Sequence, residues 1–208
     1  MKACLSLLAA AVITLGATNA MAIEEAAYAV AVKDGAFEIR DYAPHLVAET
    51  LVEGTLEEAG NKAFGRLFRY ISGGNRSREK VAMTAPVSQQ PQGEKIAMTA
   101  PVAQQRAEGR WAVSFMMPAS STLETLPTPE DPQVALRQVP GRRMAAVRYS
   151  GSWSEKGYQR NLGELESWMR GKGLAPAGDP VWARYNSPFS LWFLRRNEIL
   201  IPLAAGAE

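Results

Sequence analysis

The sequence predicts an α+β domain made of two copies of a β-β-α-β-β unit. Two features support this prediction: short alternating apolar and polar segments flank two amphipathic helical segments, and the second set repeats the first after 97 residues. Two similar halves of this kind predict a pseudo-twofold domain. The shift superposes Arg40 on Arg137, Ala48 on Ala145, Gly54 on Gly151, Glu58 on Glu155, Gly60 on Gly157 and Gly74 on Gly171.

The first half begins with two strands and a helix. Phe37–Tyr42 (FEIRDY) alternates, and Leu46–Glu53 continues in strand-like composition after a turn. Thr55 is a favourable N-cap, and apolar residues then recur at helical spacing until the glycine pair Gly73-Gly74. We therefore expect a helix that begins after Thr55 and ends at the glycines.

The middle of the chain repeats an octapeptide. Lys80–Val87 reads KVAMTAPV and Lys95–Val102 reads KIAMTAPV. The repeat lies inside one half, so it is a local duplication, and we expect its two copies to pair as a long hairpin through a loop at Gln89–Glu94. Because proline cannot donate to a ladder, Pro86 and Pro101 predict an edge or bulged strand.

The remaining elements complete the two units. A second helix is predicted over Ser154–Arg170, ended by Gly171-Lys172-Gly173. The strands predicted after the first helix are Val81–Val87, Ile96–Val102, Trp111–Met117, Val134–Val139, Arg143–Tyr149, Val181–Tyr185 and Glu198–Pro202.

Residues 1–22 are typical of a cleaved secretory signal. Lys2 precedes a short apolar run, and Ala20-Met21-Ala22 supplies an A-x-A cleavage site. A retained membrane anchor is the alternative, although the apolar run is short for a span. Cleavage removes Cys4, the only cysteine, and leaves residues 23–208 as a single periplasmic or secreted domain without a disulfide.

Charge and residue types exclude several functions. The 23 basic residues, Lys2 included, nearly balance the 21 acidic ones and are scattered, so neither nucleic acid nor an anionic membrane is an expected partner. The mature chain has one histidine, His45, and lacks a G-x-S-x-G elbow, a phosphate-binding loop and a metal-ligand cluster. We therefore expect no hydrolase chemistry and no catalytic residue.

Several blocks together resemble the SOUL haem-binding protein family. They are FEIRDY, the MTAPV motif after a helix ending in YISGGN, the strand WAVSFMMP, and YNSP followed by LRRNEILIPL. The resemblance implies a distorted eight-stranded β-barrel of two halves flanked by two helices, similar to GyrI-like small-molecule-binding domains. It also implies binding of haem or another tetrapyrrole, and leaves open an assisted reaction on that ligand, such as iron removal.

A flat apolar slot is predicted on the first helix. Asn61, Phe64, Gly65 and Phe68 share one helix face, and Arg69 lies one turn past Gly65, where it could meet a propionate. Glycine inside a helix costs about 1 kcal/mol relative to alanine, so Gly60 and Gly65 serve either a flat ligand or close helix–sheet packing. The family resemblance places the ligand against this helix and implies that Tyr185 lines the pocket.

The candidate iron ligands are few. His45 is a possible axial ligand or an exposed turn histidine, and Asp41 stands where some relatives carry a histidine. Met83 and Met98 offer thioethers, although a methionine on an alternating strand is usually a core residue. The residues Arg195–Glu198 are expected to form ion pairs that hold the last strand.

These observations predict an exported tetrapyrrole-binding protein with weak or no axial ligation. Two alternatives stay open. The same slot could bind amphipathic small molecules in general, or the duplicated MTAPV hairpin could be a docking surface of an envelope interaction protein.

Overall fold

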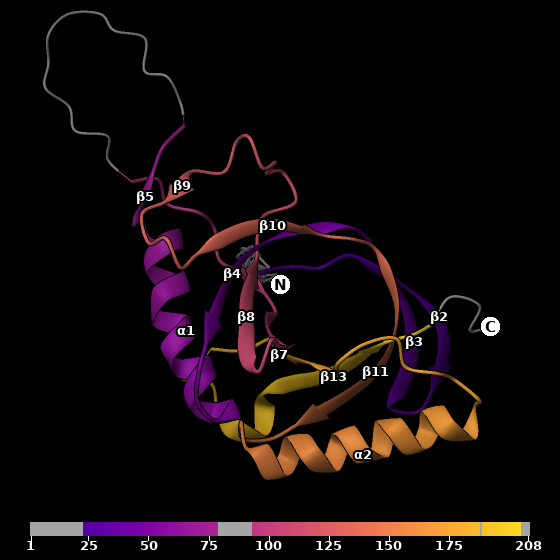
Figure 1. Cartoon of the computed structure of the whole chain (residues 1–208). Coiled ribbons are helices and arrows are strands. Elements are labelled where there is room, and N and C mark those ends of the chain that lie inside the picture. The colour runs from indigo at the N-terminus through magenta and orange to yellow at the C-terminus, as the bar shows by residue number, and fades with distance from the viewer. Residues whose placement is uncertain (1–22, 79–92, 188, 205–208) are drawn as a thin grey trace, which may run out of the picture.

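The computed structural model describes residues 23–78, 93–187 and 189–204. A nine-stranded antiparallel sheet curls into a half-barrel, and two helices, α1 (Leu56–Ile71) and α2 (Glu155–Gly171), lie on its outer face (Figure 1). The order across the sheet is β10 (Ala135–Val139), β4 (His45–Val52), β8 (Arg110–Met116), β7 (Val102–Ala107), β12 (Val181–Arg184), β13 (Arg196–Pro202), β11 (Arg142–Ser150), β3 (Phe37–Tyr42) and β2 (Tyr28–Asp34).

Shorter elements sit at the margins of this sheet. β1 (Glu24–Glu25) pairs with β6 (Thr99–Ala100), β5 (Asn75–Arg76) pairs with β9 (Thr128–Pro129), and Trp192–Leu194 form a 3-10 turn. Within the described residues, neither helix combines the length and apolar composition needed to cross a membrane.

The strand order confirms the predicted pseudo-twofold repeat. In each half the second strand pairs with the fourth and the fourth with the third, which gives β4-β8-β7 and β11-β13-β12. The halves join where β7 pairs with β12, and the first strand of each half crosses to the other, so that β3 pairs with β11 and β10 with β4. Gly54 and Gly151, superposed by the 97-residue shift, have φ of 127° and 139° before the two helices. Seven of the nine predicted strands are present, as β3, β4, β8, β10, β11, β12 and β13, and the unpredicted β7 and β2 complete the nine-stranded sheet.

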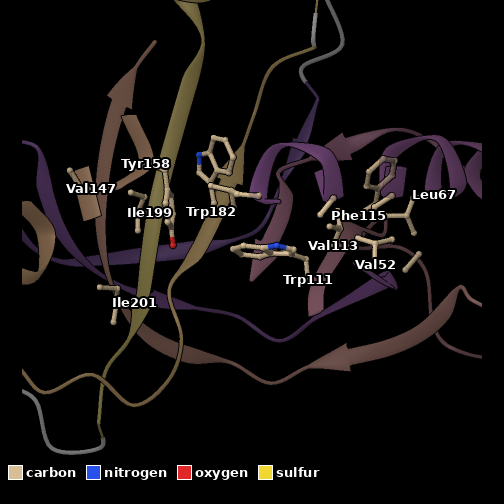
Figure 2. Close-up of a cluster of buried hydrophobic side chains, with 14 of the residues drawn as sticks. Val52, Leu67, Trp111, Val113, Phe115, Val147, Tyr158, Trp182, Ile199 and Ile201 are labelled. Atoms are coloured by element: carbon tan, nitrogen blue, oxygen red, sulfur yellow. The ribbon is translucent and has the colours of Figure 1, made fainter. Parts of the chain in front are cut away.

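The hydrophobic core fills the space between the sheet and the helices. α1 packs on β4 and β8, and α2 packs on β11 and β13. Trp111, Val113 and Phe115, predicted to share one side of a strand, lie together in this core with Trp182 and Ile199 (Figure 2). Each such side chain, when fully buried, stabilises the fold by about 1.5–3 kcal/mol.

The first helix begins and ends as predicted. The Thr55 hydroxyl accepts from the Glu58 amide at 3.3 Å, while the Glu58 carboxylate accepts from the Thr55 amide at 3.1 Å, which makes a capping box. At the other end Gly73 has a φ of 111°, a conformation that favours glycine. Local contacts therefore determine both ends of α1, independently of any ligand.

The prediction for the octapeptide repeat was partly wrong. Ile96–Val102 is not one alternating strand: only Thr99–Ala100 form β6, and Pro101, which has no amide hydrogen, separates it from β7. The Thr99 hydroxyl instead donates to the Met116 carbonyl. The first copy, Val81–Val87, and the predicted hairpin lie outside the described residues.

Candidate functional site

A cavity of about 430 Å³ lies beside α1, bounded by the helix, by β6 and by the residues after β12. We call it the helix-side cavity. Its lining residues are Ile23, Gly60, Asn61, Phe64, Phe68, Met98, Thr99, Ala100, Val102, Phe115, Trp153, Arg184, Tyr185, Asn186, Ser187 and Phe189.

One wall of the cavity is aromatic and flat. The Phe64 and Phe68 rings stack with centroids 5.8 Å apart and planes 10° apart, one turn from each other on α1. Phe64 also packs on Phe115 of β8 at 5.4 Å, which joins this wall to the core. Phe68 is 43% exposed and stands at the rim beside Met98, which is 46% exposed. An apolar wall with an exposed edge can take up a planar hydrophobic ligand.

A buried arginine lies at the inner end of the cavity. Arg184 of β12 is 7% exposed, and its Nη2 donates to the Gln104 side-chain oxygen at 3.2 Å. Its guanidinium lies 5.2 Å from the Trp153 ring and 5.1 Å from the Trp182 ring. Among the described residues its Nε has no hydrogen-bond partner and no carboxylate pairs with it. Burial lowers the pKa of Arg184 to about 10, so the group is cationic at neutral pH.

The helix makes room for this guanidinium. Gly60 is buried, and a β-carbon at that position would lie 2.6 Å from Nη2 and 2.7 Å from Nη1 of Arg184. A side chain at position 60 would therefore displace the arginine. Glycine at this position serves close packing of the helix on the sheet, which is the second of the two predicted roles.

Trp153, which precedes α2, adds a second unpaired donor to the cavity wall. Its indole Nε1 is buried and has no hydrogen-bond partner among the described residues. Arg195 lies 4.5 Å from its ring, so two cations flank this tryptophan. The inner end of the cavity is consequently electropositive and rich in donors, whereas its outer wall is apolar.

Tyr185 joins the cavity to a buried charge network. Its hydroxyl donates to the Glu198 carboxylate at 3.0 Å, and burial raises its pKa well above the ordinary value. Glu198 is fully buried and is also paired with Arg40 at 2.6 Å and with Arg196 at 2.9 Å. These contacts confirm the ion pairs predicted to hold the last strand, because Glu198 of β13 pairs with Arg40 of β3 and Arg196 of β13 pairs with Glu25 of β1.

The comparison with protein families identifies the chain. The model of the SOUL heme-binding protein family matches residues 23–202. The chain belongs to this family. Heme-binding protein 2 from Homo sapiens is 27% identical over 174 residues, which cover 79% of this chain and 80% of the human protein. The family predicted from the MTAPV and RRNE blocks is thus confirmed.

Solved structures of low sequence identity share the SOUL chain's fold. A hydrolase from Listeria innocua superposes with a TM-score of 0.54 at 12% identity, over 84% of this chain and 94% of that one. The C-terminal domain of EcmrR superposes with a TM-score of 0.52 at 11% identity, over 85% of this chain and 98% of that one. At such identities the likeness establishes architecture and nothing about chemistry.

Of the residues predicted to bind a ligand in this SOUL protein, four lie together. Asn61, Phe64, Phe68 and Tyr185 all line the helix-side cavity. Gly65 and Arg69 are exposed on α1 and do not line it, and a β-carbon on Gly65 would meet no atom within 4 Å. Met83 lies outside the described residues, whereas Met98, from the second octapeptide, is at the cavity rim.

The two candidate iron ligands lie away from the helix-side cavity. His45 lines two other cavities, one of about 120 Å³ on the inner face of the half-barrel and one of about 380 Å³, and its Nδ1 is 3.1 Å from the Ala43 carbonyl oxygen. Asp41 forms an ion pair with Arg143 at 2.8 Å, and this hydrogen bond lowers the pKa of Asp41. The described residues contain no cluster of three histidine, cysteine or acidic side chains able to hold a metal.

Arg184 and Trp153 were not predicted as site residues. Arg184 follows Trp182 by two positions on a strand, so both side chains point toward the helices. A charged residue at a core-facing position was the available signal. Trp153 lies in the short connection before α2, where the sequence pattern indicates no orientation.

Proposed function

We propose that this protein binds haem or a related tetrapyrrole in the helix-side cavity. The stacked Phe64–Phe68 wall, in a cavity of about 430 Å³, is the observation that supports it most directly. Ligand pockets range over roughly 300–1,000 Å³. The inner-face cavity of about 120 Å³ falls below that range. A cavity of about 380 Å³ beside His45 and one of about 430 Å³ at the end of α2 are large enough, but neither has a phenylalanine, tyrosine or tryptophan among its lining residues.

The cavity fits a macrocycle better than it fits an iron ligand set. Its described lining residues include neither histidine nor cysteine, and the Tyr185 hydroxyl is already bonded to Glu198. Met98 supplies the one thioether among the described residues of the wall. The binding energy would therefore come from burial of the apolar ring, with weak or no axial ligation.

A haemin titration of residues 23–208, followed in the Soret band, tests this proposal. Phe68→Ala removes an exposed ring, so the fold should be unaffected while the affinity for haemin falls about tenfold. His45→Ala is the matched control and should bind as the wild type does. Absence of saturable binding to the wild type would refute the proposal, and a Soret shift lost in His45→Ala would make that histidine the ligand.

Competition between haemin and metal-free protoporphyrin tests whether the iron contributes to binding. A protein that recognises the ring by burial alone should bind haemin and protoporphyrin about equally, and both should compete for one site. We propose no catalytic residue. A tetrapyrrole recovered chemically unchanged after incubation would support a binding role, and a converted product would contradict it.

We also propose that the protein is exported, on the strength of the apolar run and A-x-A site of residues 1–22. Protein recovered from the periplasm or the medium should begin at Ile23. A chain that begins at Met1 and stays with the membrane fraction would support the retained anchor instead.

A further inference from the structure

The buried arginine of the helix-side cavity differs from the other fully buried arginine of this chain. Arg40, 2% exposed, has Nη1 at 2.6 Å and Nη2 at 3.3 Å from the two carboxylate oxygens of Glu198. Arg184, 7% exposed, has no carboxylate partner among the described residues. The fold thus supplies an acid to one buried guanidinium and leaves the other without one.

A structural role explains only part of the surroundings of Arg184. Gln104 satisfies Nη2, and the neighbouring tryptophan rings attract the cation. Neither contact neutralises its charge, and Nε is hidden from water without an acceptor. A buried charge or donor without a partner is costly, so native proteins pair such groups with an acid, a water or a ligand.

The position of the arginine indicates which part of a ligand would reach it. Ile23, Phe68, Met98 and Phe189 form the rim and are all exposed, whereas Arg184 is among the buried lining residues. The indole nitrogen of Trp153, also buried and unpaired, lines the same cavity. An acceptor group that entered past the apolar wall would meet the buried cation of Arg184, which no carboxylate of the described residues neutralises.

We propose that Arg184 binds a carboxylate of the ligand inside the helix-side cavity, so that an acid-bearing tetrapyrrole enters with its acid edge inward. This inference rests on the proposed function and adds a chemical class: the site selects ring systems that carry a carboxylate. The sequence predicted Arg69 for this role, but Arg69 is exposed and does not line the cavity, so it would not contact a carboxylate held inside.

The test compares protoporphyrin IX with its dimethyl ester, which differs only in having no free acid. Binding to residues 23–208 is followed by quenching of tryptophan fluorescence. A charge-assisted hydrogen bond predicts that the wild type binds the diacid about 10- to 100-fold more tightly than the ester. Arg184→Gln should lower the affinity for the diacid to that for the ester and leave the ester unaffected. Arg69→Gln, the matched control, should keep the full preference.

The outcomes separate this inference from the function on which it rests. Equal affinity of the wild type for diacid and ester would overturn the role of Arg184 while leaving tetrapyrrole binding in place. An equal loss of affinity for diacid and ester in a folded Arg184→Gln variant would also overturn the role of Arg184. If neither porphyrin binds the wild type saturably, the proposed function itself fails. Because the wild-type comparison needs no variant, it decides the question even if Arg184→Gln does not fold.

Discussion

Two glycines on α1 should respond to alanine in opposite directions. A β-carbon at Gly60 would lie 2.6 Å from Nη2 of Arg184 and 3.0 Å from the Gln104 side-chain oxygen, whereas one at Gly65 would meet no atom within 4 Å. Gly65→Ala should therefore stabilise the protein, and Gly60→Ala should not.

The magnitudes follow from the two environments. Replacing an exposed glycine inside a helix by alanine gains about 1 kcal/mol, which is the whole effect expected at Gly65. Gly60→Ala has the same gain, but overpacking of a dense site costs about 1–3 kcal/mol. Displacing the guanidinium of Arg184 would break its hydrogen bond to Gln104 and its contacts with the Trp153 and Trp182 rings. We expect a net effect between neutrality and a loss of about 2 kcal/mol, so the two variants should differ by about 1–3 kcal/mol.

Urea unfolding followed by circular dichroism measures the difference directly. For a chain of this size, 1 kcal/mol corresponds to about 2–4 °C in the melting temperature, which calorimetry resolves. Arg184→Met removes the clashing guanidinium, so the double variant Gly60→Ala/Arg184→Met should recover the alanine gain relative to Arg184→Met alone. If Gly60→Ala stabilises as much as Gly65→Ala, the close approach of helix and arginine described above is incorrect.

Three further predictions concern the charge network and the cavity rim. Glu198→Gln removes the buried acid shared by Arg40 and Arg196, which keep only the less buried Glu38 and Glu25 as partners, and should lower the free energy of unfolding in urea by about 3–5 kcal/mol; a loss below about 1 kcal/mol would show that the buried pair is not important for stability. Burial acts to raise the pKa of Glu38, but the hydrogen bond and charge of Arg40 outweigh it and lower that pKa. The resulting stability is present above the unfolded-state pKa and lost as pH falls through the folded one, so Glu38→Gln should flatten the loss of stability from about pH 5 to about pH 3, and an unchanged slope would contradict this. Met98→Leu should leave the Soret position of bound haemin unchanged, whereas a shift would identify the thioether as a ligand.

The sequence carried most of the fold because local signals and tertiary packing agree. The N-cap Thr55 predicted the start of the first helix, the glycine pair Gly73-Gly74 predicted its end to within two residues, and alternation placed Trp111, Val113 and Phe115 on one face of a strand. Strand β2 was not predicted from the sequence. Most of Tyr28–Asp34 is exposed at the edge of the sheet, and its first five residues are all apolar, so the segment lacks the alternation of apolar and polar residues that is typical of a half-buried strand. The predicted strand Ile96–Val102 followed the repeated motif across Pro101. In the structure the long strand β7 begins only after that proline, which cannot donate a hydrogen bond to a neighbouring strand.

The cavity was harder to predict than the fold because it depends on contacts between distant segments. Helical spacing brought Asn61, Phe64 and Phe68 together, since neighbours on one helix are fixed by local geometry. Spacing also placed Gly65 and Arg69 near the same face, and only the position of the sheet shows that they lie beyond the cavity. Spacing within one element does not predict that Arg184 of β12 packs against Gly60 of α1.

Tyr185 shows how the two faces of the half-barrel are related. Tyr185 lines both the helix-side cavity and the small inner-face cavity. Its hydroxyl donates a hydrogen bond to Glu198, and the centre of its ring lies 3.7 Å from the Arg196 guanidinium. A side chain held by a hydrogen bond and a cation loses little rotamer freedom when a ligand arrives, so this part of the wall is preorganised. Phe68 and Met98, at the rim, have no such restraint among the described contacts and would be ordered by the ligand. The charge network therefore stabilises the last strand and at the same time restrains the part of the helix-side cavity wall that Tyr185 forms.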